Sequence, residues 1–208
     1  MHQLISFRKI AVSLAMFASI TLGAVATARA DSFLVVGNSN PNATATLTIV
    51  SLSSSQLVFS VTNTSLGVVT GFGFDLAANP GASLVSAVGG VGTYVLCTSC
   101  GNVPQFPSAV LDFGLVTHAD NFAGGNPPSG TGPGLTTPVF TISGNFTGLT
   151  QQQIADAVYV RFQALTTNPD SDVGHGGTLV PEPASMLLLG TGLLGLGAGI
   201  RRRRKATK

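Results

Sequence analysis

The chain has 208 residues, 9% of them charged, and a formal net charge of +2 at neutral pH. The charge is unevenly distributed: residues 31–178 hold seven aspartates, one arginine (Arg161) and no lysine or glutamate, a formal charge of −6. This region lacks the positive charge that neutralises phosphates, so its composition excludes nucleic acid as a partner. Its length suffices for one domain with a hydrophobic core.

Residues 1–30 predict a secretory signal peptide. A positively charged start is followed by an apolar run over residues 10–27. Ala28 and Ala30 then form the small-x-small pattern that signal peptidase cleaves. We therefore expect a signal helix, export through the secretion translocon, and a mature chain that begins at Asp31.

The body, residues 31–166, shows short β-branched runs separated by Gly, Pro, Asn and Ser, which is typical of strands and turns. We expect a mainly β fold, an antiparallel β-sandwich of about eight or nine strands. The predicted strands span residues 33–36, 44–52, 56–63, 68–76, 83–88, 92–97, 109–116, 139–146 and 158–165.

The strand predicted at 68–76 has the most regular period of two, the signature of a half-buried strand. The alternation puts Gly71 and Gly73 on one face, which predicts close packing by a large side chain or another backbone. The opposite face is predicted to hold Thr70, Phe72, Phe74 and Leu76, with Val69 and Asp75 on the glycine side.

One short helix is predicted near the end of the body. Thr150 and Gln153 have the spacing of a capping box, in which the hydroxyl and the amide satisfy backbone groups of the first turn. The segment that follows allows barely two turns. Residues 167–179 are then polar and predict a linker.

Cys97 and Cys100 are the only cysteines, and in an exported protein we expect them to form a local disulfide. A redox site is an open alternative, although such a site needs a helix N-terminus and this pair follows a predicted strand. A metal site is another, although only His118 and His175 are available as further ligands.

Asp170 and Asp172 form an alternating series of oxygen-bearing side chains with Asn168, a spacing that calcium loops use. The pattern fails at Val173 and Leu179, where an EF-hand requires glycine and glutamate. We expect a hydrated linker, with calcium binding as the open alternative.

The body offers no recognisable catalytic constellation, and we expect neither an enzyme nor a bound cofactor. It contains no nucleophile elbow of the serine hydrolases. Asp75 and Asp112 are predicted on solvated strand faces rather than as a catalytic pair. Sugar-binding modules use exposed aromatic rings, and here the only tyrosines are Tyr94 and Tyr159, with no tryptophan.

The C-terminal segment, residues 180–208, combines three devices. Val180, Pro181, Glu182 and Pro183 form a stiff extended spacer. Residues 184–200 carry no charge, and as a helix they would span roughly 26 Å, near the short end of a transmembrane segment. The basic tail, residues 201–208, begins with Arg201, Arg202, Arg203 and Arg204, which predicts a cytoplasmic C-terminus.

This segment resembles the sorting signal of PEP-CTERM proteins, which the membrane protease exosortase reads. The resemblance implies a single-pass inner-membrane stage with the body in the periplasm, cleavage near Pro181–Pro183, and release to the cell surface or beyond. The resemblance implies no single activity for the body. From the sorting tail, the polar body of low charge and the missing catalytic constellation, we expect a structural or adhesive role in the extracellular matrix or biofilm, linked to exopolysaccharide. The body loosely resembles cohesin-type and carbohydrate-module sandwiches, so a carbohydrate-binding module for the exopolysaccharide is the alternative.

Overall fold

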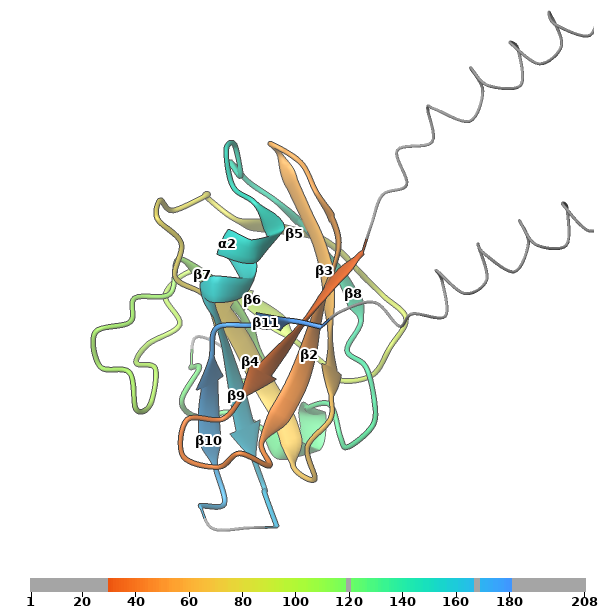
Figure 1. Ribbon diagram of the computed structural model, residues 1–208, viewed down its shortest axis with the longest axis vertical. Helices are drawn as coiled ribbons and strands as arrows, with labels where there is room; N and C mark the ends of the chain where they lie inside the picture. Colours follow the sequence, from red (N-terminus) through yellow and green to blue (C-terminus); the bar gives the residue numbers. More distant parts are fainter. Residues whose placement is uncertain (1–29, 119–120, 167–168, 181–208) are drawn as a thin grey trace, which may run out of the picture.

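The computed structural model describes residues 30–118, 121–166 and 169–180, which form two antiparallel sheets that share one core (Figure 1). The six-stranded sheet has the order β11 (Thr178–Leu179), β1 (Asp31–Val36), β2 (Thr44–Leu52), β3 (Gln56–Asn63), β8 (Val139–Ser143) and β5 (Ser83–Val88). The five-stranded sheet has the order β10 (Asp172–His175), β9 (Val158–Gln163), β4 (Val68–Phe74), β7 (Phe113–Val116) and β6 (Val95–Cys97).

The core lies between the two sheets and is built from the inward-pointing side chains, which alternate with outward-pointing ones along each strand. Phe59 of β3 lies edge-on to Phe72 of β4, with ring centroids 5.6 Å apart, and Phe140 of β8 lies 5.4 Å from Phe72. Aromatic rings in these tilted arrangements contribute beyond the apolar area that they bury. The prediction of a mainly β protein with two antiparallel sheets is confirmed.

The alternation predicted for β4 is interrupted by a bulge. The pairing with β9 shifts register between Val69 and Gly71, so Val69 joins the core with Phe72 and Phe74. The prediction that Thr70 shares their face is wrong, because one extra residue in a strand inverts the alternation before it. The close packing predicted over the glycines is confirmed: a Cβ on Gly73 would lie 2.6 Å from Leu111 Cδ1.

The helix α2 (Gln151–Asp156) begins as predicted. The Thr150 Oγ1 accepts a hydrogen bond from the Gln153 backbone N–H, and the Gln153 side chain accepts one from the Thr150 N–H. Both bonds satisfy donors that the first helical turn leaves unpaired. The buried face of α2, Ile154 and Ala155, packs into the shared core.

A second, smaller apolar cluster covers the outer face of the five-stranded sheet. The chain between β6 and β7 crosses this face, and Leu111 packs over Gly73 there. This crossing explains why β7 begins at Phe113 and not at residue 109 as predicted. The cluster contains Cys97, Cys100, Val103, Leu111, Val116, Phe122, Tyr159 and Val173.

The predicted linker at residues 167–179 is wrong where the structure describes it. Asp172–His175 form β10, paired with β9, and Thr178–Leu179 form β11, paired with β1. The body therefore extends to Val180 and is not confined to residues 31–166. The two strands are only four and two residues long, β10 contains Gly174, and Gly176 and Gly177 separate them. They are too short to show a hydrophobic period, so tertiary pairing decides their conformation.

The predicted signal peptide up to Arg29, the sorting residues from Pro181 onward, and Asn168 lie outside the described residues. Within the described ranges, no helix has both the length and the apolar character needed to cross a bilayer.

Candidate functional site

The two ends of the folded body meet at one edge of the six-stranded sheet (Figure 1). Leu34 of β1 pairs with Thr178 of β11, and the Val180 backbone N–H donates a hydrogen bond of 2.8 Å to the Ser32 carbonyl oxygen. β1 begins at Asp31, the predicted first residue of the mature chain. The first residue of the predicted sorting motif is thus hydrogen-bonded to the beginning of the body.

Asp172 fastens the C-terminal strands to the other end of the chain. Its Oδ2 accepts backbone hydrogen bonds from Ser39 (3.0 Å) and Asn40 (2.7 Å), and its Oδ1 accepts one from Val173 (2.9 Å). A Cβ on Gly37 would collide with this carboxylate, so the glycine makes room for it. Hydrogen bonds from backbone N–H groups to an ionised carboxylate are stronger than those between neutral groups, so these three bonds hold Asp172 firmly in place.

This arrangement changes the interpretation of the predicted calcium series. Asp172 is fully buried and its oxygens are occupied by amides, whereas Asp170 is exposed. Neither the hydrated linker nor a calcium loop describes Asp172. Among the described residues, no group of three or more His, Cys, Asp or Glu side chains is placed to hold a metal ion.

Arg161 of β9 is the only arginine or lysine among the described residues, and it is buried. Its Nη1 donates to the Asp172 carbonyl oxygen at 3.3 Å and its Nη2 to the Ala123 carbonyl oxygen at 3.5 Å. Burial lowers the pKa of Arg161 from its ordinary value, and the carboxylates of Asp172 and Asp170 oppose that shift. The contacts give this arginine a structural role within the domain.

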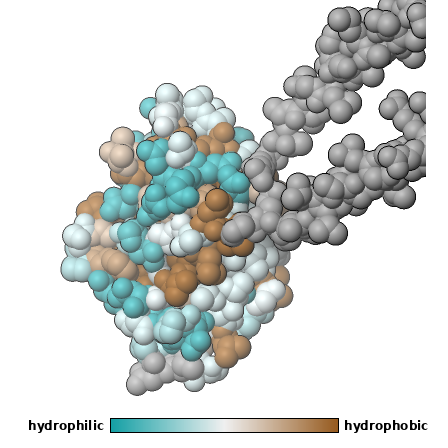
Figure 2. Space-filling view, viewed as in Figure 1, coloured by the Kyte–Doolittle hydropathy of each residue, from teal (hydrophilic) through white to brown (hydrophobic). Residues whose placement is uncertain are grey.

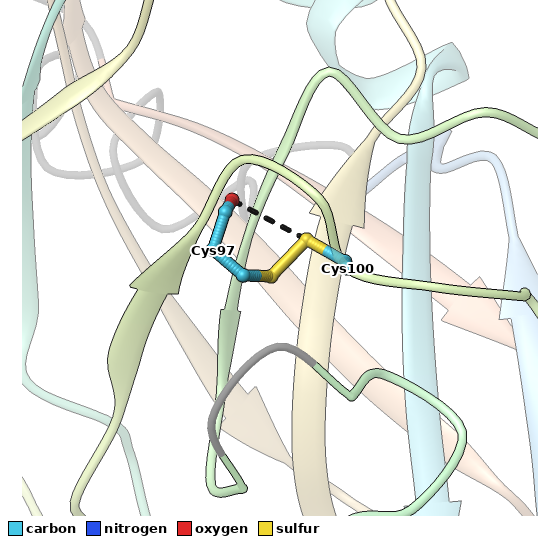
Figure 3. Close-up of a disulfide and its surroundings, with 2 residues drawn as sticks. All are labelled: Cys97 and Cys100. Atoms are coloured by element: carbon cyan, nitrogen blue, oxygen red, sulfur yellow. Dashed lines mark hydrogen bonds between the residues drawn. A yellow bond between two sulfur atoms is a disulfide. The ribbon is translucent and has the colours of Figure 1, made fainter.

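Cys97 and Cys100 form a disulfide at the end of β6, with their Cα atoms 5.3 Å apart (Figure 3). The Sγ of Cys100, which carries no proton in the disulfide, lies 3.3 Å from the Cys97 carbonyl oxygen. Both sulfurs pack over Gly114 of β7, where a Cβ would lie 2.9 Å from the Cys100 Sγ. The predicted local disulfide is confirmed, and its burial in the outer apolar cluster fits a structural pin better than a redox or metal site.

Asp75 and Asp112 lie just outside the strands and not within them as predicted. The Asp112 Oδ2 accepts the Leu76 N–H at 2.7 Å, and the Asp75 Oδ2 accepts the Val110 N–H at 3.3 Å. Partial burial raises the pKa of Asp112, and the nearby Asp75 carboxylate raises it further. Each carboxylate therefore binds backbone amides of the segment that carries the other.

A shallow groove of about 250 Å³ lies between α2 and the segment that follows β4. It contains carboxylates at Asp75 and Asp156 and an amide at Gln153. Its apolar lining is formed by Leu76, Ala77, Leu149 and Ala157. The groove combines hydrogen-bonding groups with an apolar lining, and sites that bind small ligands have this composition.

The tyrosines do not supply the exposed rings that sugar stacking requires. Tyr94 lies in the shared core, and Tyr159 is buried beneath His175, with the two rings stacked 4.2 Å apart. Phe106 lies edge-on to Tyr159 at 5.2 Å and is half-buried. Partial burial lowers the pKa of His175, while Asp75 and Asp156 act in the opposite direction.

Sequence reasoning missed the sheet edge at Val180 and the burial of Asp172. The local sequence contains no signal that distinguishes the buried Asp172 from the exposed Asp170 two residues before it. The partners of Asp172, the amides of Ser39 and Asn40, lie more than 130 residues away in the chain and leave no mark on the side-chain pattern.

Comparison with known proteins assigns the C-terminal segment. A family model described as the PEP-CTERM protein-sorting motif matches residues 179–204, in agreement with the resemblance drawn from Val180–Arg204. No curated protein and no solved structure matches the chain. The motif supports an exported protein that carries a C-terminal sorting signal for exosortase. The chain therefore carries a PEP-CTERM protein-sorting motif, and the first two residues of the match, Leu179 and Val180, belong to the edge of its folded domain.

Proposed function

We propose that this protein is a structural or adhesive component of the cell surface or extracellular matrix, delivered by exosortase processing and without enzymatic activity. The observation that carries the proposal is the direct junction between the PEP-CTERM motif and a compact, disulfide-pinned β domain. A domain with two closely packed sheets and a buried disulfide suits life outside the cell. Its low charge and many hydroxyl and amide side chains suit contact with a hydrated polysaccharide matrix.

The predicted route has an inner-membrane stage. Signal peptidase would cleave after Ala30, residues 184–200 would hold the body in the periplasm, and exosortase would cleave near Pro181–Pro183. The prolines of the motif support this route, because their sequence predicts an extended backbone and a protease binds an extended backbone more easily than a helix.

Replacing Pro181, Glu182 and Pro183 together by alanine tests this route. We expect the variant to accumulate in the membrane fraction with its basic tail intact, while the parent reaches the surface or the medium. The matched control is a triple alanine variant of Lys205, Thr207 and Lys208, which lies in the tail and leaves the matched residues 179–204 unchanged. Equal surface delivery of the parent and the motif variant would contradict the proposed route.

The groove beside α2 favours a second candidate, a binding module for the exopolysaccharide. Asp75, Asp156 and Gln153 could accept and donate hydrogen bonds to sugar hydroxyls beside the apolar lining. The test is retention of the processed protein on the native polysaccharide. We expect Asp156→Ala to weaken retention and Asp170→Ala, which lies outside the groove, to leave it unchanged. No retention of the parent would eliminate this candidate.

A further inference from the structure

Exposed apolar side chains lie on and directly beside β1 and β11, the strands by which the chain enters and leaves the body. Leu34 and Val36 of β1 are 36% and 40% exposed, and Leu179 and Val180 at the end of β11 are 50% and 41% exposed. Leu34, Val36 and Val180, which bonds to Ser32, point to one face of the sheet, whereas Leu179 pairs with the core residue Phe33 and points to the other face. We call Leu34, Val36 and Val180 the exit patch. Figure 2 shows apolar side chains gathered on this face of the molecule. Of the residues in β1 and β11, only Asp31 is charged.

The chain length beyond Val180 limits how far this edge can lie from a bilayer. Four peptide steps separate Val180 from Ala184, where the uncharged segment begins, and a fully extended chain covers at most about 14 Å in four residues. The headgroup layer of one leaflet is itself roughly 5–8 Å thick. While residues 184–200 are inserted, the exit patch must therefore lie in or beside the headgroup layer.

The same edge also receives the chain from the opposite direction. Asp31 follows directly on the predicted signal peptide, and the Val180–Ser32 hydrogen bond places the two exits side by side. Before signal peptidase acts, both membrane-directed segments would leave the body at this one edge. Both segments can reach the membrane at the same time only if the body turns its β1–β11 edge toward it.

We propose that the exit patch is a membrane-contact surface, whose apolar side chains rest at the boundary between headgroups and acyl chains while the protein is anchored. Apolar side chains at this depth leave water, as those of interfacial segments do. A second copy of the chain is a less favourable occupant, because it is not held there by a covalent connection and each body carries a formal charge of −6. The inference rests on the anchored stage of the proposed function.

The absence of tryptophan from the sequence permits a direct test. Leu34→Trp places a single fluorophore in the exit patch. Val110→Trp is the matched control, because Val110 is 74% exposed and belongs to the connection between β6 and β7. The strands β6 and β7 lie in the other sheet from β1 and β11 (Figure 1). The anchored chain would be purified from cells that lack exosortase and reconstituted in phosphatidylcholine vesicles with bromine-substituted acyl chains.

We expect the emission of Leu34→Trp to shift to shorter wavelength and to lose several-fold more intensity to the brominated lipid than that of Val110→Trp. Val36→Trp, which lies on the same face of β1, provides a second position in the patch if Leu34→Trp does not fold. Equal quenching at the patch and at the control would overturn the inference. So would a blue shift without quenching that disappears when protein is diluted in lipid, because that outcome assigns the patch to a second copy.

Flotation of the same vesicles separates this inference from the proposed function. If the chain floats with the vesicles but the patch tryptophan is not quenched, the membrane-contact surface is wrong and anchoring stands. If the chain does not float, anchoring by residues 184–200 is wrong, and the contact surface is overturned with it.

Discussion

Individual buried polar groups hold distant parts of this domain together. The Tyr94 hydroxyl donates to the Val69 carbonyl oxygen at 2.7 Å and lies 2.8 Å from the Thr131 Oγ1, which joins three separate segments. Asp172 does the same for β10 and the turn after β1. Because such groups leave water on folding, removing one partner leaves the others unsatisfied at a cost of about 1–3 kcal/mol each.

The first prediction concerns Tyr94 and alkaline pH. Burial raises the pKa of Tyr94 from 10.0 to about 12. The folded state therefore holds this proton more tightly than the unfolded state does, so the stabilisation is complete below pH 10 and is lost as pH rises from 10 to 12. We expect Tyr94→Phe to lower the free energy of unfolding by roughly 1–2 kcal/mol at pH 8, and to weaken the decline above pH 10.

Urea unfolding at a series of pH values, followed by circular dichroism, measures both effects. Tyr159 is present in both proteins, so its own raised pKa contributes equally to both curves. Parallel stability curves for parent and variant between pH 10 and 12 would contradict the assignment to Tyr94.

The second prediction separates Asp172 from its neighbour. We expect Asp172→Ala to lower the free energy of unfolding by roughly 2–4 kcal/mol, because two or three buried amides lose their acceptor. Asp170→Ala, at an exposed position, should change it by no more than about 0.5 kcal/mol. Calorimetry with calcium and with a chelator should give the same melting temperatures, and a calcium-dependent rise in the parent would restore the calcium interpretation.

At the level of elements, the sequence predicts the strands whose side chains alternate and misses those that pairing alone creates. β2 and β3 have the predicted bounds because apolar residues recur at every second position. β10 and β11 carry no such pattern. The bulge in β4 likewise depends on its partner β9, so local alternation put Thr70 on the wrong face. The Cys97–Cys100 disulfide could be predicted from the sequence, because the export signal and the short spacing of the two cysteines are both visible there.

The third prediction concerns the pairing of β11 with β1. Proteases bind the backbone next to the cleaved bond in an extended form, yet the Val180 amide is already bonded to Ser32. We expect that β11 must leave the sheet before exosortase can engage the motif. A disulfide between Leu34→Cys and Thr178→Cys, which are directly paired and lie outside the matched motif, should slow processing several-fold.

Pulse-labelling of the anchored and processed forms in cells measures this rate. The two single-cysteine variants are the controls, and both should be processed at the parental rate. Parental kinetics in a fully oxidised double variant would show that the motif is read with β11 in place.

For the whole molecule, the arrangement of segments matters more than any single site. Removing the two terminal segments from the charge count turns a slightly basic chain into an acidic domain with one arginine. The sorting tail was recognisable from sequence because its spacer, apolar span and basic block are contiguous. The sequence did not predict that the two ends of the body meet at the β1–β11 edge, because this meeting depends on pairing between residues about 145 positions apart.

The central claim is that the PEP-CTERM motif directs this domain to exosortase processing and export. Intact-mass spectrometry of the mature protein, from cells with and without exosortase, tests it most directly. With exosortase active, we predict a product that begins at Asp31, ends near Pro181–Pro183 and lacks Arg201–Lys208, and without it an anchored form that retains them. A product that still carries Arg201–Lys208 in cells with active exosortase would contradict the claim.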